Sequence, residues 1–168
     1  KKHGAKIQFT NIKKNNYESY GDINIKSGRI IPIKAKKEYY VKATDEYPIL
    51  FVIAALSQGV SIFKGIGDLA NKESNRIKEM QKILKQIGIK SVVYKDQIKI
   101  YGKNIIDNKN KKIFVPNLGD HRICMSTQIL SLITGVKAKI NNFETVFTSS
   151  PSFLKIIESL GGNFEIKK

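Results

Sequence analysis

The pattern of apolar and polar positions separates predicted helices from predicted strands along this chain. In residues 71–88, Ile77, Met80, Leu84 and Ile87 recur at three- and four-residue spacing, which predicts a helix with one buried stripe. Three further segments combine a long apolar pattern with a glycine at or near the end, the usual position of a helix stop. The predicted helices are 45–59, 71–88, 120–135 and 150–162.

The segments between these helices are shorter and rich in β-branched and aromatic residues, which favours strands. Residues 89–102 carry two such runs around Lys95 and Asp96, so they predict a strand pair that turns there. The mixture of helices and strands predicts the α/β (α+β) class. The predicted strands are 3–9, 38–43, 60–65, the pair within 89–102, 111–116, 136–143 and 163–166.

The order of these elements repeats. Asp45 and Asp120 each head a helix, and each helix is followed by a strand, a second helix, a glycine and a strand. The period is about 70–75 residues, which is typical of an internal repeat, although an ordinary α+β domain with coincidental spacing is an alternative. We predict closing strands of a preceding unit in 1–33, a complete β-α-β-α-β-β unit in 34–106, and a second, nearly complete unit in 107–168. On this hypothesis the chain is a piece of a longer protein.

Composition excludes several classes of protein. The chain has 41% apolar residues, enough for one buried core, and it lacks an uninterrupted run of 18 apolar residues that could span a membrane. A single cysteine, Cys124, excludes an internal disulfide, and with only two histidines it argues against a structural zinc site. We therefore expect no metal, no membrane partner and a cytoplasmic location.

The net charge of +16 leaves nucleic acid, an anionic membrane surface or anionic small molecules as candidate partners. Lysine supplies 27 of the 30 basic residues, alongside many isoleucines and asparagines, an excess typical of an AT-rich genome. Arginine is more informative, because its planar guanidinium matches carboxylates and phosphates. The three arginines are Arg29, Arg76 and Arg122, and the last two lie at predicted helix starts.

The start of the predicted helix 71–88 is unusual because Lys72, Glu73 and Arg76 occur there together. A helix N-terminus is already positive, so two cations are unfavourable unless an anion lies among them. A surface ion pair between Glu73 and Arg76 explains part of the pattern. The alternative is a site in which Lys72 and Arg76 bind an anion and Glu73 donates a proton beside it.

Two aspartates precede apolar helices. Asp45 either caps the helix that follows or acts as a general base at the mouth of a site. Asp120 is a second cap candidate, and Arg122 in the same first turn needs a partner, which is Asp120 or an external anion. His121 is better explained as a structural histidine than as a catalytic one, and Cys124 as a small core residue.

Together, and in this order, these segments resemble one enzyme family. The sequence reads "DEYPIL" at 45–50, "KESNR" at 72–76, "DHRICM" at 120–125 and "SSPSF" at 149–153. The 5-enolpyruvylshikimate-3-phosphate synthase (3-phosphoshikimate 1-carboxyvinyltransferase) family, a branch of the enolpyruvyl transferases, reads D-E-x-P, K-E-S-D-R, D-H-R-x-A-M and S-F-P-x-F at similar spacings. The resemblance covers essentially the whole chain and corresponds to the C-terminal part of the family's sequence.

The resemblance implies the inside-out barrel of that family, in which each of two similar domains contains three β-α-β-α-β-β units. It also implies transfer of the enolpyruvyl group from phosphoenolpyruvate to the 5-hydroxyl of shikimate-3-phosphate, with release of phosphate and without metal or organic cofactor. This is a step of the shikimate pathway of aromatic amino-acid biosynthesis. By the resemblance, Asp45 accepts the hydroxyl proton and Glu73 moves a proton at the methylene carbon. Lys72, Arg76 and Arg122 bind the substrate anions.

Two departures from the family carry expectations of their own. Asn75 replaces the aspartate of K-E-S-D-R, so we expect Arg76 to lose an orienting negative charge. The family's upstream substrate-binding residues are not in this sequence, so we expect the chain alone to be inactive. We expect its partner to be the missing N-terminal half of the same protein. We expect the full-length protein to be a monomer. The rival hypotheses are another carboxyvinyl transferase, a basic nucleic-acid-binding module with steep salt dependence, and a folded remnant that binds nothing.

Overall fold

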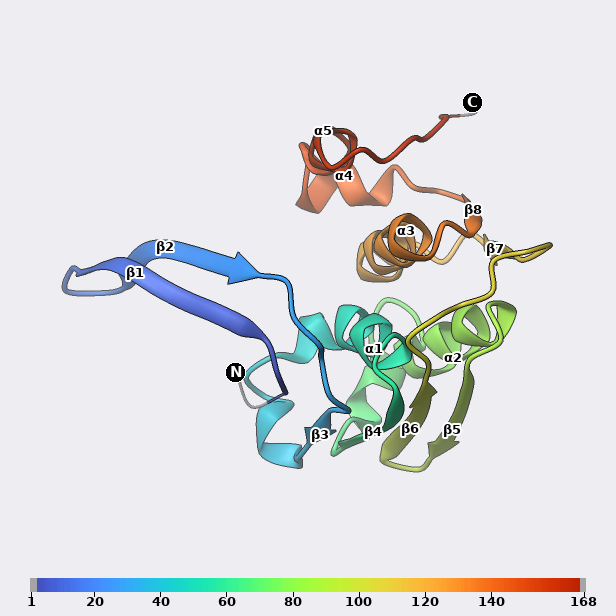
Figure 1. The fold of residues 1–168 in the computed structure, drawn as a ribbon, viewed down its shortest axis with the longest axis horizontal. Coiled ribbons are helices and arrows are strands. Elements are labelled where there is room, and N and C mark those ends of the chain that lie inside the picture. Colours follow the sequence, from blue (N-terminus) through green and yellow to red (C-terminus); the bar gives the residue numbers. More distant parts are fainter. Residues whose placement is uncertain (1–2, 167–168) are drawn as a thin grey trace.

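A four-stranded sheet forms one side of the molecule in the computed structural model, which describes residues 3–166 (Figure 1). Its strand order is β3-β4-β6-β5. The first pair is parallel and the other neighbours are antiparallel, as in a parallel strand pair extended by a hairpin. The strands are β3 (Lys34–Ala35), β4 (Gly59–Lys64), β5 (Lys90–Tyr94) and β6 (Gln97–Gly102).

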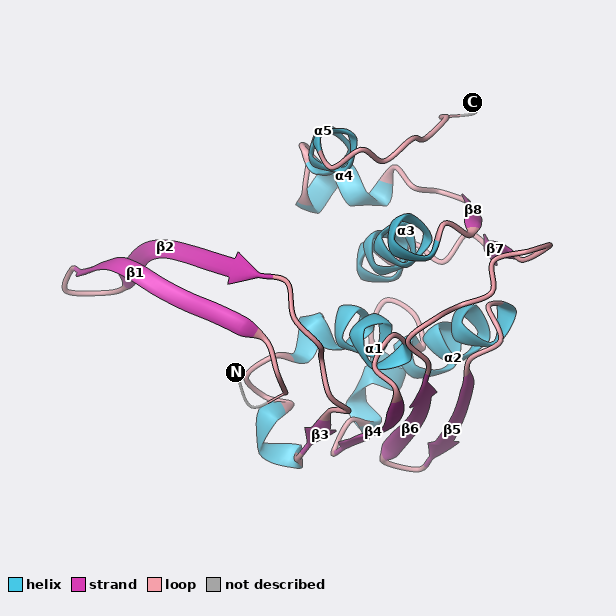
Figure 2. Cartoon of the chain, in the orientation of Figure 1, coloured by secondary structure: helices cyan, strands magenta, loops and turns pink. Residues whose placement is uncertain are grey.

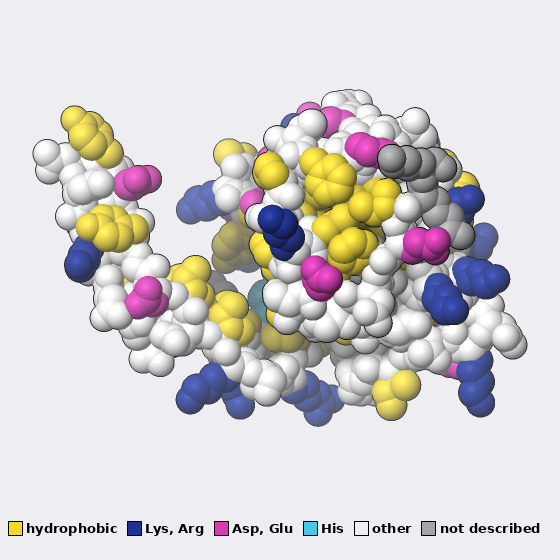
Figure 3. All heavy atoms as spheres, turned by 90° about the horizontal axis from the view of Figure 1, so that it is seen from above, with side chains coloured by type: hydrophobic (Ala, Val, Ile, Leu, Met, Phe, Trp, Pro, Cys, Tyr) yellow, Lys and Arg dark blue, Asp and Glu magenta, His cyan; other side chains and the backbone are white. Residues whose placement is uncertain are grey.

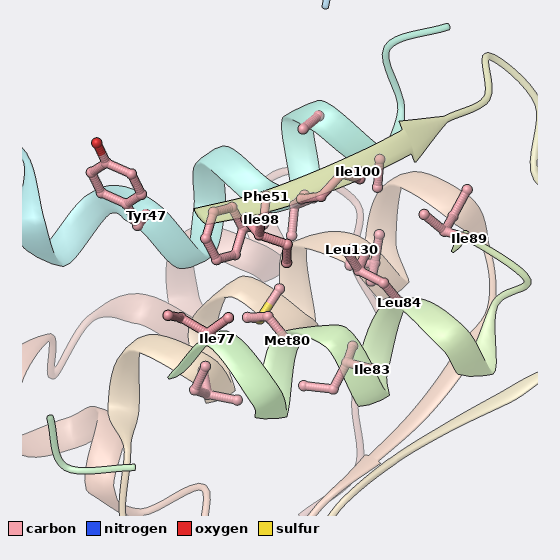
Figure 4. Close-up of a cluster of buried hydrophobic side chains, with 14 of the residues drawn as sticks. Tyr47, Phe51, Ile77, Met80, Ile83, Leu84, Ile89, Ile98, Ile100 and Leu130 are labelled. Atoms are coloured by element: carbon pink, nitrogen blue, oxygen red, sulfur yellow. The ribbon is translucent and has the colours of Figure 1, made fainter. Parts of the chain in front are cut away.

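Two helices, α1 (Tyr47–Ala55) and α2 (Arg76–Gln86), cover one face of this sheet (Figure 1). Strand residues alternate between the two faces, so that Ile98 and Ile100 of β6 point into the core and are fully buried. Figure 4 shows side chains of α1, α2 and β6 converging with Leu130 from a third helix. The core therefore lies between the sheet and the helices, with the other face of the sheet turned outward.

The second half of the chain continues on the side of α1 and α2 away from the sheet (Figure 2). Helix α3 (His121–Thr134) packs against α1, and β7 (Lys112–Val115) pairs in parallel with β8 (Lys137–Ile140). Two short helices, α4 (Thr145–Ser149) and α5 (Phe153–Ser159), follow. Among residues 3–166, no helix is long and apolar enough to cross a membrane.

An antiparallel hairpin of β1 (Lys6–Lys14) and β2 (Ser19–Lys26) precedes the sheet and projects from the rest of the molecule (Figure 1). Ile7 pairs with Ile25 and Phe9 with Ile23, so these four apolar side chains share one face of the hairpin. Phe9, Ile23 and Ile25 remain largely exposed. The strand predicted at 3–9 is confirmed in part, because β1 starts at Lys6 and continues to Lys14.

Most of the predicted elements are present, and the mixed α/β class is confirmed. Helices α1 and α3 lie within the predicted segments 45–59 and 120–135, and α3 ends at Gly135, whose φ of 68° requires the left-handed conformation that favours glycine. Strands β4 to β8 fall at their predicted positions. The division of the chain at residues 33 and 106 stays a prediction.

The strand predicted at 38–43 is wrong. Residues Lys37–Tyr39 form a 3-10 turn, and backbone hydrogen bonds from Tyr40, Lys42 and Ala43 to carbonyls three residues earlier continue the turn. The only strand in this region is the two-residue β3, just upstream. Tyr40 instead packs its ring edge-on against Tyr47 of α1, with 5.4 Å between ring centroids, so tertiary packing overrides the β propensity of "EYYV".

The helix predicted from residue 71 starts later, at Arg76. Lys72 and Glu73 therefore precede the helix rather than occupying its first turn. Asn75 is its N-cap, and its side-chain oxygen accepts a hydrogen bond from the Lys78 backbone N–H at 3.0 Å. Asn75 therefore satisfies the helix N-terminus, and the expected loss of a charge that orients Arg76 stays a prediction.

Replacing Asn75 with alanine is expected to lower the free energy of unfolding by about 1 kcal/mol, because alanine cannot accept the capping hydrogen bond. Asn75→Asp is expected to change stability by less than about 0.5 kcal/mol, since asparagine and aspartate are comparable caps. Urea denaturation followed by circular dichroism measures both. A large increase in the free energy of unfolding from Asn75→Asp would show that a negative charge at this position stabilises the fold.

The C-terminal predictions are only partly correct. The helix predicted at 150–162 is α5, but α4 immediately before it was not anticipated, and residues 163–166 are not a strand. These residues and β8 both line an open groove, together with Phe143, Phe147 and Leu154. Figure 3 shows apolar side chains gathered on this side of the molecule. Within the described part of the chain, residues 163–166 belong to none of the three sheets, and a strand outside a sheet is not stable.

Candidate active site

The starts of three helices meet at one place in the fold. Asp45 lies in the 3-10 turn Thr44–Glu46 that leads into α1, Arg76 is the first residue of α2, and Asp120 is the N-cap of α3. The packing of α1 against both α2 and α3 brings these ends together although they are far apart in sequence. Helix N-termini present unsatisfied N–H groups, so their convergence favours negative charge.

Arg76 is the centre of this cluster. Its side chain is 1% exposed and binds three carboxylates. Nε donates to Asp120 Oδ2 at 3.0 Å, Nη1 to Asp45 Oδ1 at 3.0 Å, and Nη2 to Glu73 Oε2 at 2.6 Å. Burial alone favours the neutral guanidine, but the hydrogen bonds and charge of Asp120, together with Asp45 and Glu73, outweigh it and raise the pKa of Arg76.

Asp120 is fully buried, and it does two things at once. It caps α3 by accepting hydrogen bonds from the backbone N–H groups of Arg122 (3.0 Å) and Ile123 (3.3 Å). It also accepts from Arg76 and from the Ser74 hydroxyl, which lies 2.9 Å from Oδ2. Since both of its oxygens are occupied, Asp120 is fixed in position, and it fixes Arg76 in turn.

Asp45 bridges the two arginines of the site. Its Oδ2 accepts from Arg122 Nη2 at 3.3 Å, while Oδ1 binds Arg76. It does not cap α1, whose N-cap is Glu46 without a side-chain hydrogen bond, so the capping interpretation of Asp45 is wrong. The hydrogen bond from Arg76 lowers the pKa of Asp45, and the charges of Arg122, Arg76 and Lys72 contribute in the same direction.

Glu73 and Lys72 lie on the solvent side of the cluster. The Glu73 side chain is 49% exposed and contacts Arg76, while Lys72 Nζ lies 2.9 Å from Asp68 Oδ2. The Tyr40 hydroxyl donates to the same Asp68 oxygen at 2.9 Å. Burial and this hydrogen bond raise the pKa of Tyr40 to about 12, so the hydroxyl keeps its proton at neutral pH.

Arg122 has one donor that the described residues leave without a partner. Its Nε–H is buried and makes no hydrogen bond, whereas Nη2 reaches Asp45. The side chain is 33% exposed, so part of its head faces solvent. A buried donor without an acceptor is unfavourable, and an oxygen-bearing ligand beside Arg122 would satisfy it.

The structure therefore brings together four of the five predicted site residues in direct contact: Asp45, Glu73, Arg76 and Arg122. Lys72 is adjacent, with its ammonium paired to Asp68. The catalytic and binding roles of these residues stay predictions.

Sequence analysis missed Asp120 as a ligand of Arg76 and did not single out Ser74. Asp120 was interpreted as a cap or as a partner of Arg122, and its second function depends on a long-range contact. The serine within "KESNR" was the available signal for Ser74, because it lies between two charged positions of the motif.

Such an arrangement can bind a small anion and move protons next to it. Two guanidiniums provide donors for a carboxylate or phosphate, and two half-exposed carboxylates, Asp45 and Glu73, are available for proton transfer. A nucleic-acid-binding module is not favoured, because Arg76 is buried and both Arg76 and Arg122 are engaged with carboxylates instead of lining an exposed face.

Comparison with known proteins places the chain among enzymes of one kind. The family model of EPSP synthase (3-phosphoshikimate 1-carboxyvinyltransferase) matches residues 2–157. The 3-phosphoshikimate 1-carboxyvinyltransferase of Persephonella marina is 35% identical over 164 residues, covering 97% of this chain and 37% of that protein. The enzyme of the same name from Alkaliphilus metalliredigens is 33% identical over 150 residues, covering 89% and 34%.

A comparison of structures also relates the chain to EPSP synthase. A solved structure of EPSP synthase from Acinetobacter baumannii superposes with a TM-score of 0.87 at 32% identity, covering 98% of this chain and 38% of that one. The chain thus spans about a third of the length of the relatives that it matches.

Proposed function

The chain belongs to the EPSP synthase family, and on that premise we propose that it supplies one side of the active site of a 3-phosphoshikimate 1-carboxyvinyltransferase. The proposed reaction transfers the enolpyruvyl group of phosphoenolpyruvate to the 5-hydroxyl of shikimate-3-phosphate and releases phosphate. The observation that carries the proposal is the cluster in which Arg76 and Arg122 share Asp45, with Glu73 beside them.

Both substrates are anions, and the two arginines are the groups of this chain suited to bind them. We assign Arg76 and Arg122 to the carboxylate and phosphate of phosphoenolpyruvate, because a guanidinium can donate two parallel hydrogen bonds to either group. Lys72 lies close enough to lower the pKa of Asp45 by its charge, and it adds a mobile ammonium between the two substrates. Fixed donors of this kind stabilise charge that develops during addition and elimination.

The two half-exposed carboxylates take the proton-transfer steps. Asp45 accepts the proton of the attacking 5-hydroxyl of shikimate-3-phosphate. The hydroxyl oxygen can then bond to the substituted carbon of phosphoenolpyruvate. Glu73 delivers a proton to the methylene carbon during addition and removes one during elimination, when phosphate leaves. Asp120 and Ser74 do not contact substrate in this scheme, and they hold Arg76 in place.

The remaining side of the site comes from segments outside this chain, which spans about a third of its relatives. The test uses the 168-residue chain with and without the portion of the Persephonella marina relative that lies outside the match. We expect no phosphate release from phosphoenolpyruvate and shikimate-3-phosphate with the chain alone, and measurable release when the two polypeptides are mixed or co-expressed.

Two results would contradict the proposal. Release by the chain alone would show that one side of the site suffices. A folded, associated pair that releases no phosphate from these substrates would contradict the assigned reaction, and repeating the assay with other alcohols would then test a different carboxyvinyl transfer. The complementary polypeptide alone is the control for background activity.

A further inference from the structure

Asp45 is placed as a bound carboxylate ligand would be. Its two oxygens bind two guanidiniums from different helices, at 3.0 Å to Arg76 Nη1 and 3.3 Å to Arg122 Nη2. One oxygen on each of two arginines is the arrangement expected for a substrate carboxylate or phosphate held between them. An internal side chain therefore occupies the groups that the proposed function assigns to the substrate.

The charges in the cluster also show that carboxylates of this chain occupy the two guanidiniums. Three carboxylates, Asp45, Glu73 and Asp120, surround the two guanidiniums of Arg76 and Arg122, so the cluster carries one net negative charge. The three carboxylates therefore compete with an approaching phosphate or carboxylate for the donors of the two guanidiniums. An anion that binds to both guanidiniums has to displace a carboxylate from them.

The three carboxylates are not equally able to move. Asp120 is fully buried and caps α3, so it cannot leave without exposing two backbone N–H groups. Glu73 is half-exposed, and within residues 3–166 it contacts one of the two arginines, Arg76. Asp45 is half-exposed, lies in a short 3-10 turn, and is the carboxylate that contacts both arginines.

We infer that Asp45 acts as an internal placeholder on the Arg76–Arg122 pair, and that the phosphate or carboxylate group of an incoming substrate displaces it. This inference rests on the proposed function, since it takes both arginines as the anion-binding groups. The buried Nε–H of Arg122, which lacks an acceptor in the described residues, gains one when the larger anion takes the place of Asp45.

Displacement has a consequence for catalysis. The hydrogen bond from Arg76, with the charge of Arg122, holds the pKa of Asp45 low and makes it a weak base while these contacts last. When an anion takes over these guanidiniums, that effect is removed and Asp45 becomes a stronger base. Binding of the anion thus prepares Asp45 to accept the proton of the hydroxyl.

The first test is calorimetric titration of the 168-residue chain with inorganic phosphate at low salt. Asp45→Asn removes the placeholder and is expected to tighten phosphate binding roughly tenfold, because phosphate no longer competes with an internal charge-assisted pair. Glu73→Gln is the matched control, since it removes the same charge from the same guanidinium at the same exposure (49% against 50%). We expect it to tighten binding by less than about threefold.

The outcomes separate this inference from the function on which it rests. Unchanged or weaker binding by Asp45→Asn, or an equal gain from Glu73→Gln, overturns the placeholder while leaving the anion site intact. No phosphate binding by the wild type or either variant overturns both the placeholder and the anion-binding role of the two arginines.

A second measurement uses the wild-type chain and needs no variant. The carboxyl carbon of Asp45 is followed by NMR through a pH titration, with and without saturating phosphate. The inference predicts that phosphate raises the pKa of Asp45. A pKa that stays the same, or falls, while phosphate is demonstrably bound shows that Asp45 keeps its contacts with the arginines and overturns the proposal.

Discussion

Replacing Arg76 with methionine is expected to lower the free energy of unfolding by about 3–5 kcal/mol, the largest stability effect that we predict for a single substitution in this chain. The change leaves Asp120 buried and charged without its guanidinium, and it also frees Asp45 and Glu73 from their common partner. Small domains are stable by only about 5–15 kcal/mol, so such a loss is a substantial fraction of the total stability. Urea denaturation followed by circular dichroism measures the loss.

Arg29→Met is the matched control, because Arg29 is exposed and the same chemical change there is expected to cost less than about 0.5 kcal/mol. The double variant Arg76→Met/Asp120→Asn is expected to recover part of the stability, since it removes the buried charge as well as its partner. A loss below about 1 kcal/mol for Arg76→Met alone would mean that Asp120 is satisfied by Ser74 and the helix N-terminus without the arginine.

The second large effect concerns the reconstituted enzyme. Glu73→Gln is expected to lower kcat for phosphate release by about 10²–10⁴-fold, the range found when a group that transfers protons is removed. Glutamine keeps the size of the side chain and can still accept a hydrogen bond from Arg76, so we expect the fold to be unchanged. Steady-state kinetics with both substrates, together with circular dichroism of the variant, measure the two parts of this expectation.

Glu158→Gln provides the control for this experiment, since Glu158 is an exposed residue of α5 outside the cluster and loses the same charge. Its kcat is expected to stay within about twofold of the wild type. A Glu73→Gln enzyme with unchanged kcat and a raised KM would show that Glu73 helps to bind substrate and does not transfer the proton.

The sequence predicted those parts of the fold in which local preference and tertiary packing agree. Helix α3 has an apolar body, an N-cap at Asp120 and a left-handed glycine at its end, and each signal is satisfied in the structure. The segment 38–43 has strong β propensity, yet it turns, because Tyr40 finds a ring partner in Tyr47 and a hydrogen-bond acceptor in Asp68. Partners 7 and 28 positions away in sequence leave no local pattern.

At the candidate site, too, local sequence patterns predicted some features, and long-range contacts determined the others. The cations around 72–76 suggested an anion near a helix start, and the anions observed there are carboxylates of this chain, from as far away as Asp45 and Asp120. The sequence identified the participants but not their pairing, because both aspartates looked like helix caps and only one of them is. Likewise, Asn75 was noted in the sequence as a lost charge, and its role as the N-cap of α2 was not predicted.

The hairpin of β1 and β2 has a consequence for the behaviour of the chain in solution. It carries Phe9, Ile23 and Ile25 on one exposed face, a surface that tends to stick to another copy. The net charge of +16 opposes this by keeping molecules apart at low ionic strength. At about 0.15 M salt the charges are screened beyond about 8 Å, so the repulsion weakens while the apolar attraction persists. We therefore expect added salt to promote aggregation of this strongly basic chain.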